Sequence, residues 1–308
     1  VDTTSFGIRR RRDPEIEEYS RHGSFITGID SFDCRMFGVD TNASALIDPQ
    51  QRMLLKVVVD AMHAGYLDSR HARGSNTAVF VGICNNDKDT VLREHVIELA
   101  MGGSSYNDIV DTVGIIAYST YAFASNRISY ILGLIGTSIS IDCASASALV
   151  AVHVAANEVK RELNFNLRCL ASSVNLILHH NLTDLHTARN MFPKDGRSKT
   201  FDASADGFER GEGVGATLLR NSMEMDGEVS IVYIAGSVSI HKGGGASLRA
   251  LRGPAIQLKV HRALETASME PNDVKYIEAS GLGEPYGDAV EVSAYQNVFE
   301  PERISNDR

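Results

Sequence analysis

A run of small residues between a strand pattern and a helix pattern places the strongest constraint on how this chain folds. The strand pattern covers Ser138–Asp142, the small residues are Cys143-Ala-Ser-Ala-Ser-Ala148, and the helix pattern covers Leu149–Val159. Small side chains allow a strand to pass into a buried helix through a tight turn. Backbone N–H groups at a helix start have no partner within the helix, so this turn is a candidate site for chemistry.

Strand and helix patterns alternate along the rest of the chain. Apolar residues at helical spacing predict helices, and short runs rich in β-branched residues predict strands. The predicted helices are Pro49–Gly65, Tyr118–Leu132 and Pro254–Ala267, and the predicted strands are Thr77–Ile83, one strand within Leu167–Leu178, Val214–Leu219, Val229–Ile240 and Val274–Glu278. This alternation predicts the α/β class.

Composition excludes several classes of protein. The 308 residues are 43% apolar and 22% charged, which is ordinary for a globular chain and too apolar for a disordered one. The most apolar stretch, Ile128–Ile141, is shorter than the roughly 20 residues that a membrane span needs. A net charge of −9 disfavours nucleic-acid binding. The four cysteines are far apart, which argues against a disulfide scaffold and favours an intracellular, reducing compartment, either cytoplasm or plastid.

Three side chains in the small-residue turn are candidate nucleophiles: Cys143, Ser145 and Ser147. The positive end of a helix stabilises a thiolate and can hold an oxyanion. The alternative interpretation is a tightly packed turn without chemistry. The pattern alone leaves both interpretations open.

Longer motifs of the chain resemble the β-ketoacyl synthase domains of multidomain polyketide and fatty-acid synthases. These motifs are Asp48-Pro-Gln-Gln-Arg52, Ala124-Ser-Asn-Arg-Ile-Ser-Tyr130, the long segment Asp195–Gly213, Gly253-Pro-Ala255 and Glu278–Asp288. The resemblance runs in consistent order from near Phe25 to near Phe299, and so it covers most of the chain.

The resemblance implies a thiolase-like layered αβαβα fold that is incomplete at both ends. Residues 1–228 would form an N-terminal half without its first strand, and residues 229–308 would begin a truncated C-terminal half. We therefore expect exposed apolar surface near Val229–Ile240 unless a partner covers it. Ketosynthases pair through the strand before the nucleophile, here Ser138–Asp142, so the resemblance implies a homodimer or a subunit of a larger complex.

The resemblance also assigns positions in the active site. In the family, a cysteine in a DTACSSS motif takes an acyl group from a carrier-protein thioester, and two histidines then promote decarboxylative condensation. Ser145 falls on the cysteine position, and Cys143 falls where the family has threonine. Ser280 falls on the first histidine position, in EAHGTGTP, and the second histidine is expected beyond Arg308.

The expected substrate pocket differs from the family pattern as well. The two threonines of EAHGTGTP fall on Leu282 and Glu284, and a carboxylate facing the pocket would repel a malonyl thioester. The predicted pocket residues are Cys143, Ser147, Gly213, Gly281, Leu282 and Glu284. No intrinsic cofactor is implied. If function is retained, the resemblance implies contact with the phosphopantetheine of an acyl carrier protein.

Two hypotheses of function follow. The first is a non-catalytic structural or carrier-docking subunit, in which paired buried charges hold the central motif: Asp202, Asp206, Arg210 and Glu212. The second is an acyltransferase-type enzyme that uses Ser145 for slow acyl transfer, thioester hydrolysis or decarboxylation. A third interpretation, one piece of a longer active synthase, does not restore the cysteine or the first histidine.

A serine nucleophile would need a base within hydrogen-bond reach. The histidines available are His153, His179, His180, His186 and His241, and the resemblance places none of them at the site. The adjacent pair His179 and His180 has no third ligand at suitable spacing, so we expect no metal site there.

Overall fold

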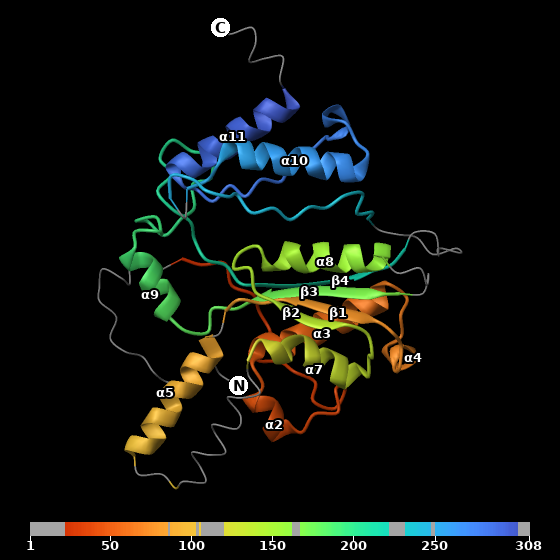
Figure 1. Ribbon diagram of the computed structural model, residues 1–308. Coiled ribbons are helices and arrows are strands. Elements are labelled where there is room, and N and C mark those ends of the chain that lie inside the picture. The colour runs from red at the N-terminus through yellow and green to blue at the C-terminus, as the bar shows by residue number, and fades with distance from the viewer. Residues whose placement is uncertain are drawn as a thin grey trace, which may run out of the picture. The chain divides into compact units, whose positions relative to one another are not determined.

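The computed structural model describes residues 22–85, 87–102, 105, 120–161, 167–221, 232–247 and 250–300 (Figure 1). These residues form two compact units, each considered by itself. The first unit contains the described residues of 25–180 and 211–221, and the second contains those of 22–24, 181–210 and 232–300. The predicted boundary between residues 228 and 229 lies outside the described residues.

The first unit is built on a sheet whose strands run in the order β2-β1-β3-β4. The strands are β1 (Ala78–Gly82), β2 (Ser138–Ile141), β3 (Cys169–Asn175) and β4 (Gly213–Leu219). β1 is parallel to β2 and to β3, and β4 is antiparallel to β3. β1 is buried along its whole length, as expected for a β-branched strand between two parallel neighbours.

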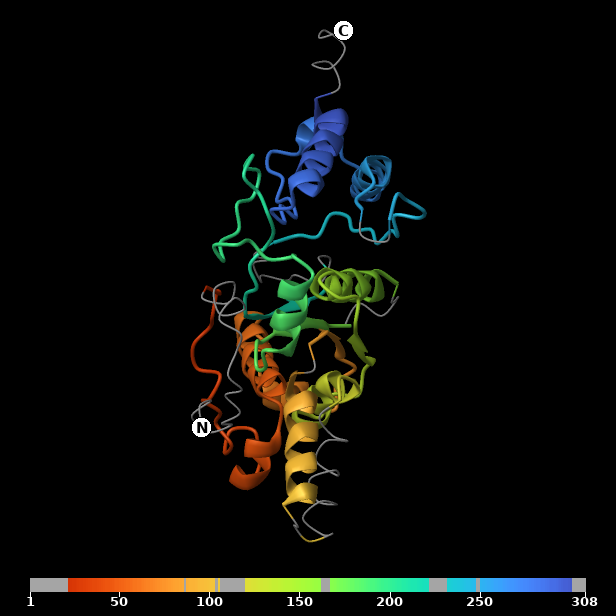
Figure 2. The same cartoon turned by 90° about the vertical axis from the view of Figure 1, so that its left-hand side faces the viewer.

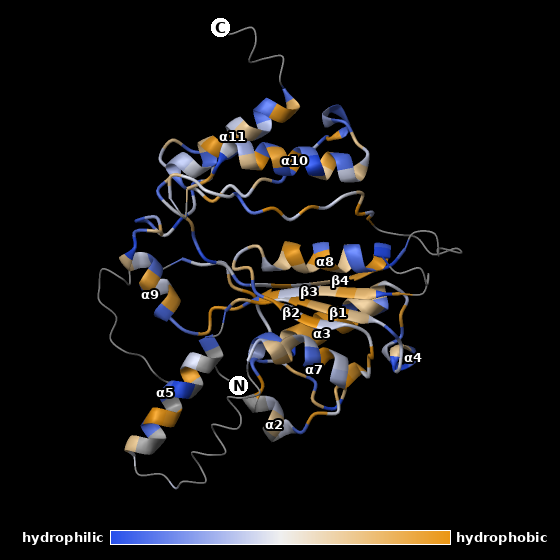
Figure 3. Ribbon diagram, in the orientation of Figure 1, coloured by the Kyte–Doolittle hydropathy of each residue, from blue (hydrophilic) through white to orange (hydrophobic). Residues whose placement is uncertain are grey.

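Helices cover both faces of this sheet (Figure 1). Val79 and Val81 of β1 pack in the same cluster as α3 (Pro49–Ala64) and α7 (Ala122–Leu132). Ala78 and Phe80, which alternate with them, pack with α8 (Ser147–Arg161). Figure 3 shows the apolar strands between these two helical layers. The first unit is therefore an αβα sandwich in which side chains alternate between two cores.

Local sequence signals explain where α3 begins and ends. The Asp48 carboxylate accepts a hydrogen bond from the Gln50 amide at 2.8 Å, and Pro49 occupies the first turn, so the helix starts there. Gly65 follows the last residue and donates to the Ala61 carbonyl. The smaller helices of this unit are α2 (Thr41–Leu46), α4 (Ser69–Ala72) and α5 (Asp87–Met101). α5 projects away from the sheet in both views (Figures 1 and 2).

The regular elements of the second unit, in the part that the structure describes, are helices joined by long irregular segments. Its elements are α9 (Asn181–Ala188), α10 (Gly253–Ala267), the short 3₁₀ helix η3 (Pro271–Asp273) and α11 (Pro285–Phe299). α10 packs against α11. No described helix of either unit has the length and apolarity required to cross a bilayer.

Two strand predictions fail in the described residues. Residues 232–240 and 274–278 form no regular secondary structure. A strand exists only beside another strand, and the described part of the second unit supplies no neighbour for either segment. Val232 is 74% and Tyr233 is 66% exposed, in agreement with the expectation of uncovered apolar surface near Val229–Ile240.

The other predicted elements form close to their expected positions. The helix predicted over Tyr118–Leu132 is α7, which starts at Ala122, and the first two residues of the prediction lie outside the described residues. The sequence patterns did not predict α5, α9 or α11. In α11 the buried positions include Asp288 and Glu291, so the helix lacks a purely apolar stripe.

Candidate functional site

The small-residue turn between β2 and α8 is closed by its own hydrogen bonds. The Ser147 hydroxyl donates to the Ala144 carbonyl at 2.7 Å and accepts from the Cys143 amide at 2.9 Å. The Ala144 amide donates to the Asp142 carboxylate at 3.0 Å, and Ala144 has a φ of +50°. Ser147 is buried. Its hydroxyl therefore holds the turn through one donated and one accepted hydrogen bond.

The first turn of α8 lies against the end of β1. A Cβ atom on Gly82 would lie 2.5 Å from the Ser147 carbonyl oxygen, which is a steric overlap. The Gly82 carbonyl itself accepts a hydrogen bond from the Ser173 hydroxyl at 2.7 Å. Because Gly82 has no side chain, the end of β1 and the first turn of α8 can lie in close contact. This contact fixes the position of the turn.

Ser145 and Cys143 are exposed in this turn. Among the described residues, no side chain or backbone group forms a hydrogen bond with the Ser145 hydroxyl. Four backbone amides that could form the expected oxyanion hole already have acceptors. The amides of Cys143 and Ala144 donate to side chains in the turn, and those of Ala146 and Ser147 donate to turn carbonyls.

The histidines considered as bases have other contacts. His153 lies beside Asn157 on α8, and the amide nitrogen of Asn157 is 3.1 Å from the Nε2 atom of His153. His179 stacks on His180, and its Nε2 atom lies 3.4 Å from the Glu94 carboxylate.

In the second unit, His186 packs edge-on against Phe192, and His241 Nδ1 accepts from the Gly243 amide. The described residues contain no cluster suited to hold a metal ion.

The loop that carries Ser280 is held by two buried carboxylates of α11. Glu291 accepts from the Ser280 and Gly281 amides, both at 2.9 Å. Asp288 accepts from the Gly283 amide at 3.0 Å and from the Phe201 amide at 2.9 Å. Asp288 is 6% and Glu291 is 5% exposed. The loop conformation is therefore fixed through its backbone, while Ser280 itself is exposed.

These two carboxylates were not predicted as site residues. A signal exists in the sequence, because Asp288 and Glu291 are three residues apart and share one face of a helix that follows a glycine-rich loop. Glu291 also accepts a hydrogen bond from the Tyr295 hydroxyl at 3.0 Å. Burial, followed by the nearby Glu291 carboxylate, raises the pKa of Tyr295 to about 12, so this hydroxyl remains a donor at neutral pH.

A cavity of about 230 Å³ lies in the second unit beside the start of α11. Its lining residues are Asn190, Met191, Asp206, Gly207, Glu284, Pro285, Tyr286 and Gly287. Of the predicted pocket residues, only Glu284 lines this cavity, and Leu282 is exposed outside it. Two of the lining residues carry carboxylates, and one of them, Asp206, is ion-paired with Lys199.

Three of the other predicted pocket residues, Cys143, Ser147 and Gly213, belong to the first unit. Gly213 starts β4, pairs with Asn175 of β3, and has open space around its α-carbon. The structure brings Cys143, Ser145 and Ser147 together in one turn. Gly281, Leu282 and Glu284 lie with Ser280 in the second unit, which is considered separately.

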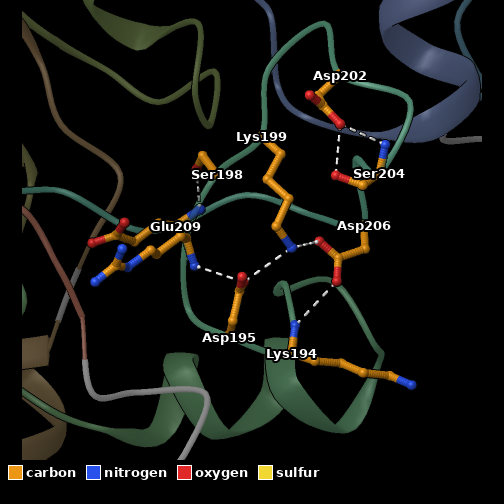
Figure 4. A network of polar contacts seen from close by, with 9 residues as sticks. Lys194, Asp195, Ser198, Lys199, Asp202, Ser204, Asp206 and Glu209 are labelled. Atoms are coloured by element: carbon orange, nitrogen blue, oxygen red, sulfur yellow. Dashed lines mark hydrogen bonds and ion pairs between the residues drawn. The ribbon is translucent and has the colours of Figure 1, made fainter.

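Lys199 is the centre of a polar network in the central motif (Figure 4). Its Nζ atom lies 3.0 Å from Asp195 Oδ1 and 2.9 Å from Asp206 Oδ1. The Lys194 amide also donates to Asp206, at 3.3 Å. The prediction that this motif buries its charges is wrong, because Asp202 is exposed and accepts from Ser204, and Asp206, Arg210 and Glu212 are only half-buried.

Arg210 and Glu212, the other two charged residues predicted to hold the central motif, each have hydrogen-bond partners. The Arg210 guanidinium donates to the Thr183 hydroxyl at 2.8 Å. The Glu212 carboxylate accepts from the Ile177 amide at 2.9 Å and from the Ile26 amide at 3.2 Å. Both side chains therefore tie backbone or loop segments within their own unit.

We expect a Lys199→Met substitution to raise the pKa of Asp195. The hydrogen bond from Lys199 is the largest cause that holds this pKa below its ordinary value. The contribution of the pair to stability is present above about pH 4 and is lost as the pH falls through the lowered pKa. An NMR titration of the Asp195 carboxyl carbon measures the change. Lys194→Met is the matched control, because the Lys194 side chain points away from the network (Figure 4), and an equal change there would contradict the prediction.

Solved ketosynthase structures share this fold. The ketosynthase from module 6 of the bacillaene synthase of Bacillus subtilis aligns with a TM-score of 0.81 at 25% identity, covering 98% of this chain and 48% of that chain. A ketosynthase domain of Streptomyces albus aligns with a TM-score of 0.78 at 27% identity over 91% of this chain. The fold is thus the predicted thiolase-like α/β class, and the chain spans about half of the solved ketosynthase chains.

The sequence comparisons identify the family. The model of the "Beta-ketoacyl synthase, N-terminal domain" matches residues 4–224, and that of the "Beta-ketoacyl synthase, C-terminal domain" matches residues 231–307. The chain belongs to the beta-ketoacyl synthase family. It is 32% identical to 6-methylsalicylic acid synthase of Penicillium expansum over 305 residues, which is 96% of this chain and 16% of that protein. It is also 32% identical to a phenolphthiocerol/phthiocerol polyketide synthase chain of Mycobacterium tuberculosis, over 91% of this chain and 12% of that one.

Proposed function

We propose that this chain is a ketosynthase-like domain that does not catalyse condensation and acts as a structural or carrier-docking part of a larger assembly. The observation that carries the proposal is the serine at position 145, whose hydroxyl has no hydrogen-bonded base among the described residues. A serine also stands at the first histidine position, 280.

The chemistry of thioester attack supports this proposal. A thiolate attacks a thioester readily at neutral pH, whereas a serine hydroxyl needs a base to remove its proton. Cys143 lies two residues from the nucleophile position and is separated from it by the left-handed Ala144, so its thiol occupies a different place in the turn. It does not substitute for a cysteine at 145.

The cavity beside α11 supports the same conclusion. Glu284 lines the cavity at a position where the resemblance implies threonine. The carboxylate of a malonyl unit would meet the negative charge of Glu284 there, whereas the charge of Asp206 is paired with Lys199. A binding site for a malonyl thioester would instead require neutral or cationic groups.

The alternative, an altered acyltransferase that uses Ser145, has less support. It would require a base and oxyanion donors beside the hydroxyl. In the described part of the chain, the hydroxyl has no hydrogen bond, and four amides of the turn already have acceptors inside it.

A radiolabelled acyl-carrier transfer assay separates the two functions. We expect no covalent acyl label on the native chain after incubation with an acyl-carrier thioester. Peptide mass spectrometry then locates any label, with Ser145→Ala and Cys143→Ser as controls. A label on Ser145 that Ser145→Ala removes would overturn the non-catalytic function.

The proposed assembly is a homodimer within a larger multidomain protein. The relatives named above are long polyketide synthases, of which this chain matches 12–16%. β2 lies at an edge of the described sheet, and apolar side chains around it are exposed: Tyr130, Ile135, Ile139 and Leu149. An exposed strand edge with apolar neighbours is an interaction surface.

We expect an Ile139→Lys substitution to shift the chain from dimer to monomer. Ile139 lies on β2 and is 44% exposed, so a charge there would oppose burial at a β2 interface without disturbing the core. Leu185→Lys is the matched control, because Leu185 on α9 is 45% exposed. Analytical ultracentrifugation measures both variants. A monomeric native chain, or an Ile139→Lys variant that remains dimeric, would contradict the proposed interface.

Three further features belong to this proposal. We expect residues 1–228 and 229–308 to be the two ketosynthase halves, which is supported by family matches that end at residue 224 and resume at 231. The prosthetic group would be the phosphopantetheine of a carrier protein, since no intrinsic cofactor is expected. An intracellular, reducing compartment is supported by four cysteines that are all free thiols.

A further inference from the structure

The parallel strands β1 and β2 end side by side, and each is followed within two residues by a cysteine. Gly82 pairs with Ile141 at the last register position of the two strands. The backbone pairing continues one residue further, because the Ile83 amide donates to the Ile141 carbonyl at 3.0 Å. Counted in this register, Cys84 lies opposite Cys143. The fold therefore brings together two cysteines that are far apart in the sequence.

The same register places both cysteines on the face of the sheet that α8 covers. Phe80 of β1 and Ile141 of β2 pack in the cluster that contains α8, whereas Ile83 packs in the cluster on the opposite face. Side chains alternate between the two faces along a strand. Cys84 comes four residues after Phe80, and Cys143 comes two residues after Ile141, so both belong to the α8 face.

Contacts in the first unit hold each cysteine backbone in place. The Cys143 amide donates to the Ser147 hydroxyl at 2.9 Å. The Ser147 carbonyl oxygen in turn lies 2.5 Å from the position that a Cβ atom on Gly82 would take, so the turn lies against the end of β1. The Cys84 carbonyl accepts a hydrogen bond from the Tyr121 hydroxyl at 3.0 Å. Cys143 is thus fixed beside the segment that carries Cys84.

The spacing of neighbouring strands suits a disulfide. Strands lie about 4.8 Å apart in a sheet, and a disulfide joins residues whose α-carbons lie about 4.4–6.8 Å apart. Both cysteines carry reduced thiols in this structure. A bridge between them would require rotation of two side chains that share one face.

We propose that Cys84 and Cys143 form a reversible disulfide within one chain, by thiol exchange with a low-molecular-weight disulfide. The Cys143 thiolate attacks one sulfur of that disulfide, so a mixed disulfide forms and one thiolate leaves. The Cys84 thiolate then attacks the Cys143 sulfur, so the protein disulfide forms and the second thiolate leaves. The two cysteines lose two electrons and the small disulfide gains them. The two protons of the protein thiols pass to the two leaving thiolates.

The environments of the cysteines set this order of reaction. Cys143 is exposed, whereas Cys84 is half-buried, so a small disulfide reaches Cys143 first. Cys143 also precedes α8, whose positive end favours the thiolate. Cys169 is buried and pairs with Ala78, at the other end of β1 from Cys84. The Sγ atom of Cys34 lies 3.1 Å from Ser44 Oγ, and no register position relates Cys34 to the other cysteines in the described sheet.

Oxidised glutathione is the probe, and the full chain is incubated with it at neutral pH. The remaining thiols are alkylated, and trypsin, which cleaves at Lys88 and Arg127 between the two cysteines, gives unreduced peptides for mass spectrometry. We expect one linked pair of peptides, which carry Cys84 and Cys143. In Cys84→Ser, once excess glutathione is removed, the adduct on Cys143 should persist at least about ten times longer than in the native chain. Cys34→Ser is the matched control and should change neither result.

The proposal is overturned if no linked pair forms, if either cysteine is linked to Cys34, to Cys169 or to another chain, or if the adduct on Cys143 persists equally in the native chain and in Cys84→Ser. Oxidation in urea tests the role of the fold, because the pairing of Cys84 with Cys143 should lose its preference there, and an unchanged yield would also overturn the proposal. The identity of the linked peptides in the native chain decides the question even if Cys84→Ser does not fold. No acyl thioester is present, so the result is independent of the proposed function.

Discussion

A Ser145→Cys variant is expected to become acylated by an acyl-carrier thioester at least about a hundred times faster than the native chain. The variant places a thiol at the exposed position just before α8, where the positive end of the helix favours the thiolate. The turn is closed by Ser147 and Asp142, so the substitution removes none of its hydrogen bonds. Intact-mass spectrometry over time measures the added acyl group.

The acylation experiment requires a background in which the neighbouring thiol cannot react. Ser145→Cys is therefore built on Cys143→Ser, and Cys143→Ser alone is the matched control. An adduct that forms only in the double variant would support the view that the native turn keeps the geometry for acyl transfer and lacks only the nucleophile. An unreactive double variant would show that the turn itself no longer supports acyl transfer, and an adduct on the Cys143→Ser control would place the chemistry at a different residue.

An Asp288→Ala substitution is expected to destabilise the second unit by about 2–4 kcal/mol. The carboxylate accepts hydrogen bonds from the buried Gly283 amide and from the part-buried Phe201 amide, and its removal leaves both without their acceptor. Gly283 has a φ of +79° and lies against the Gly207 carbonyl, so the loop has little freedom to find another acceptor. Urea unfolding followed by circular dichroism measures the loss.

Two further substitutions in α11 serve as controls for Asp288→Ala. Asp288→Asn keeps one carbonyl acceptor and the shape of the side chain, so its loss should be smaller than that of alanine. Gln296→Ala removes an exposed side chain from the same helix and should change stability by less than about 0.5 kcal/mol. Equal destabilisation by Gln296→Ala and Asp288→Ala would contradict the role of the carboxylate.

Elements whose signals are local could be predicted from the sequence. α3 has an Asp48 cap, a proline in its first turn and an apolar stripe, and it forms as expected. β1 is a short β-branched run and is buried between two strands. The turn at Cys143–Ser147 was found because a run of small residues between a strand and a helix is itself a local pattern.

Features that depend on distant parts of the chain could not be predicted in this way. Residues 232–240 have the composition of a strand, but pairing requires a neighbour, which composition does not specify. The role of Asp288 requires knowledge that Gly283 and Phe201, far apart in sequence, both present amides to one carboxylate. Ser147 was a candidate nucleophile in the sequence. The hydrogen bonds that occupy its hydroxyl became visible only in the three-dimensional structure.

The way Glu291 holds the loop has a consequence for how such a chain evolves. The carboxylate binds the amides of residues 280 and 281, and every amino acid except proline supplies an amide at position 280. A mutation at position 280 can therefore change the side chain without removing these hydrogen bonds, so natural selection for stability does not determine which side chain stands there. The same tolerance means that an imidazole could be placed at this position by a single amino-acid substitution, with the hydrogen bonds to Glu291 unchanged.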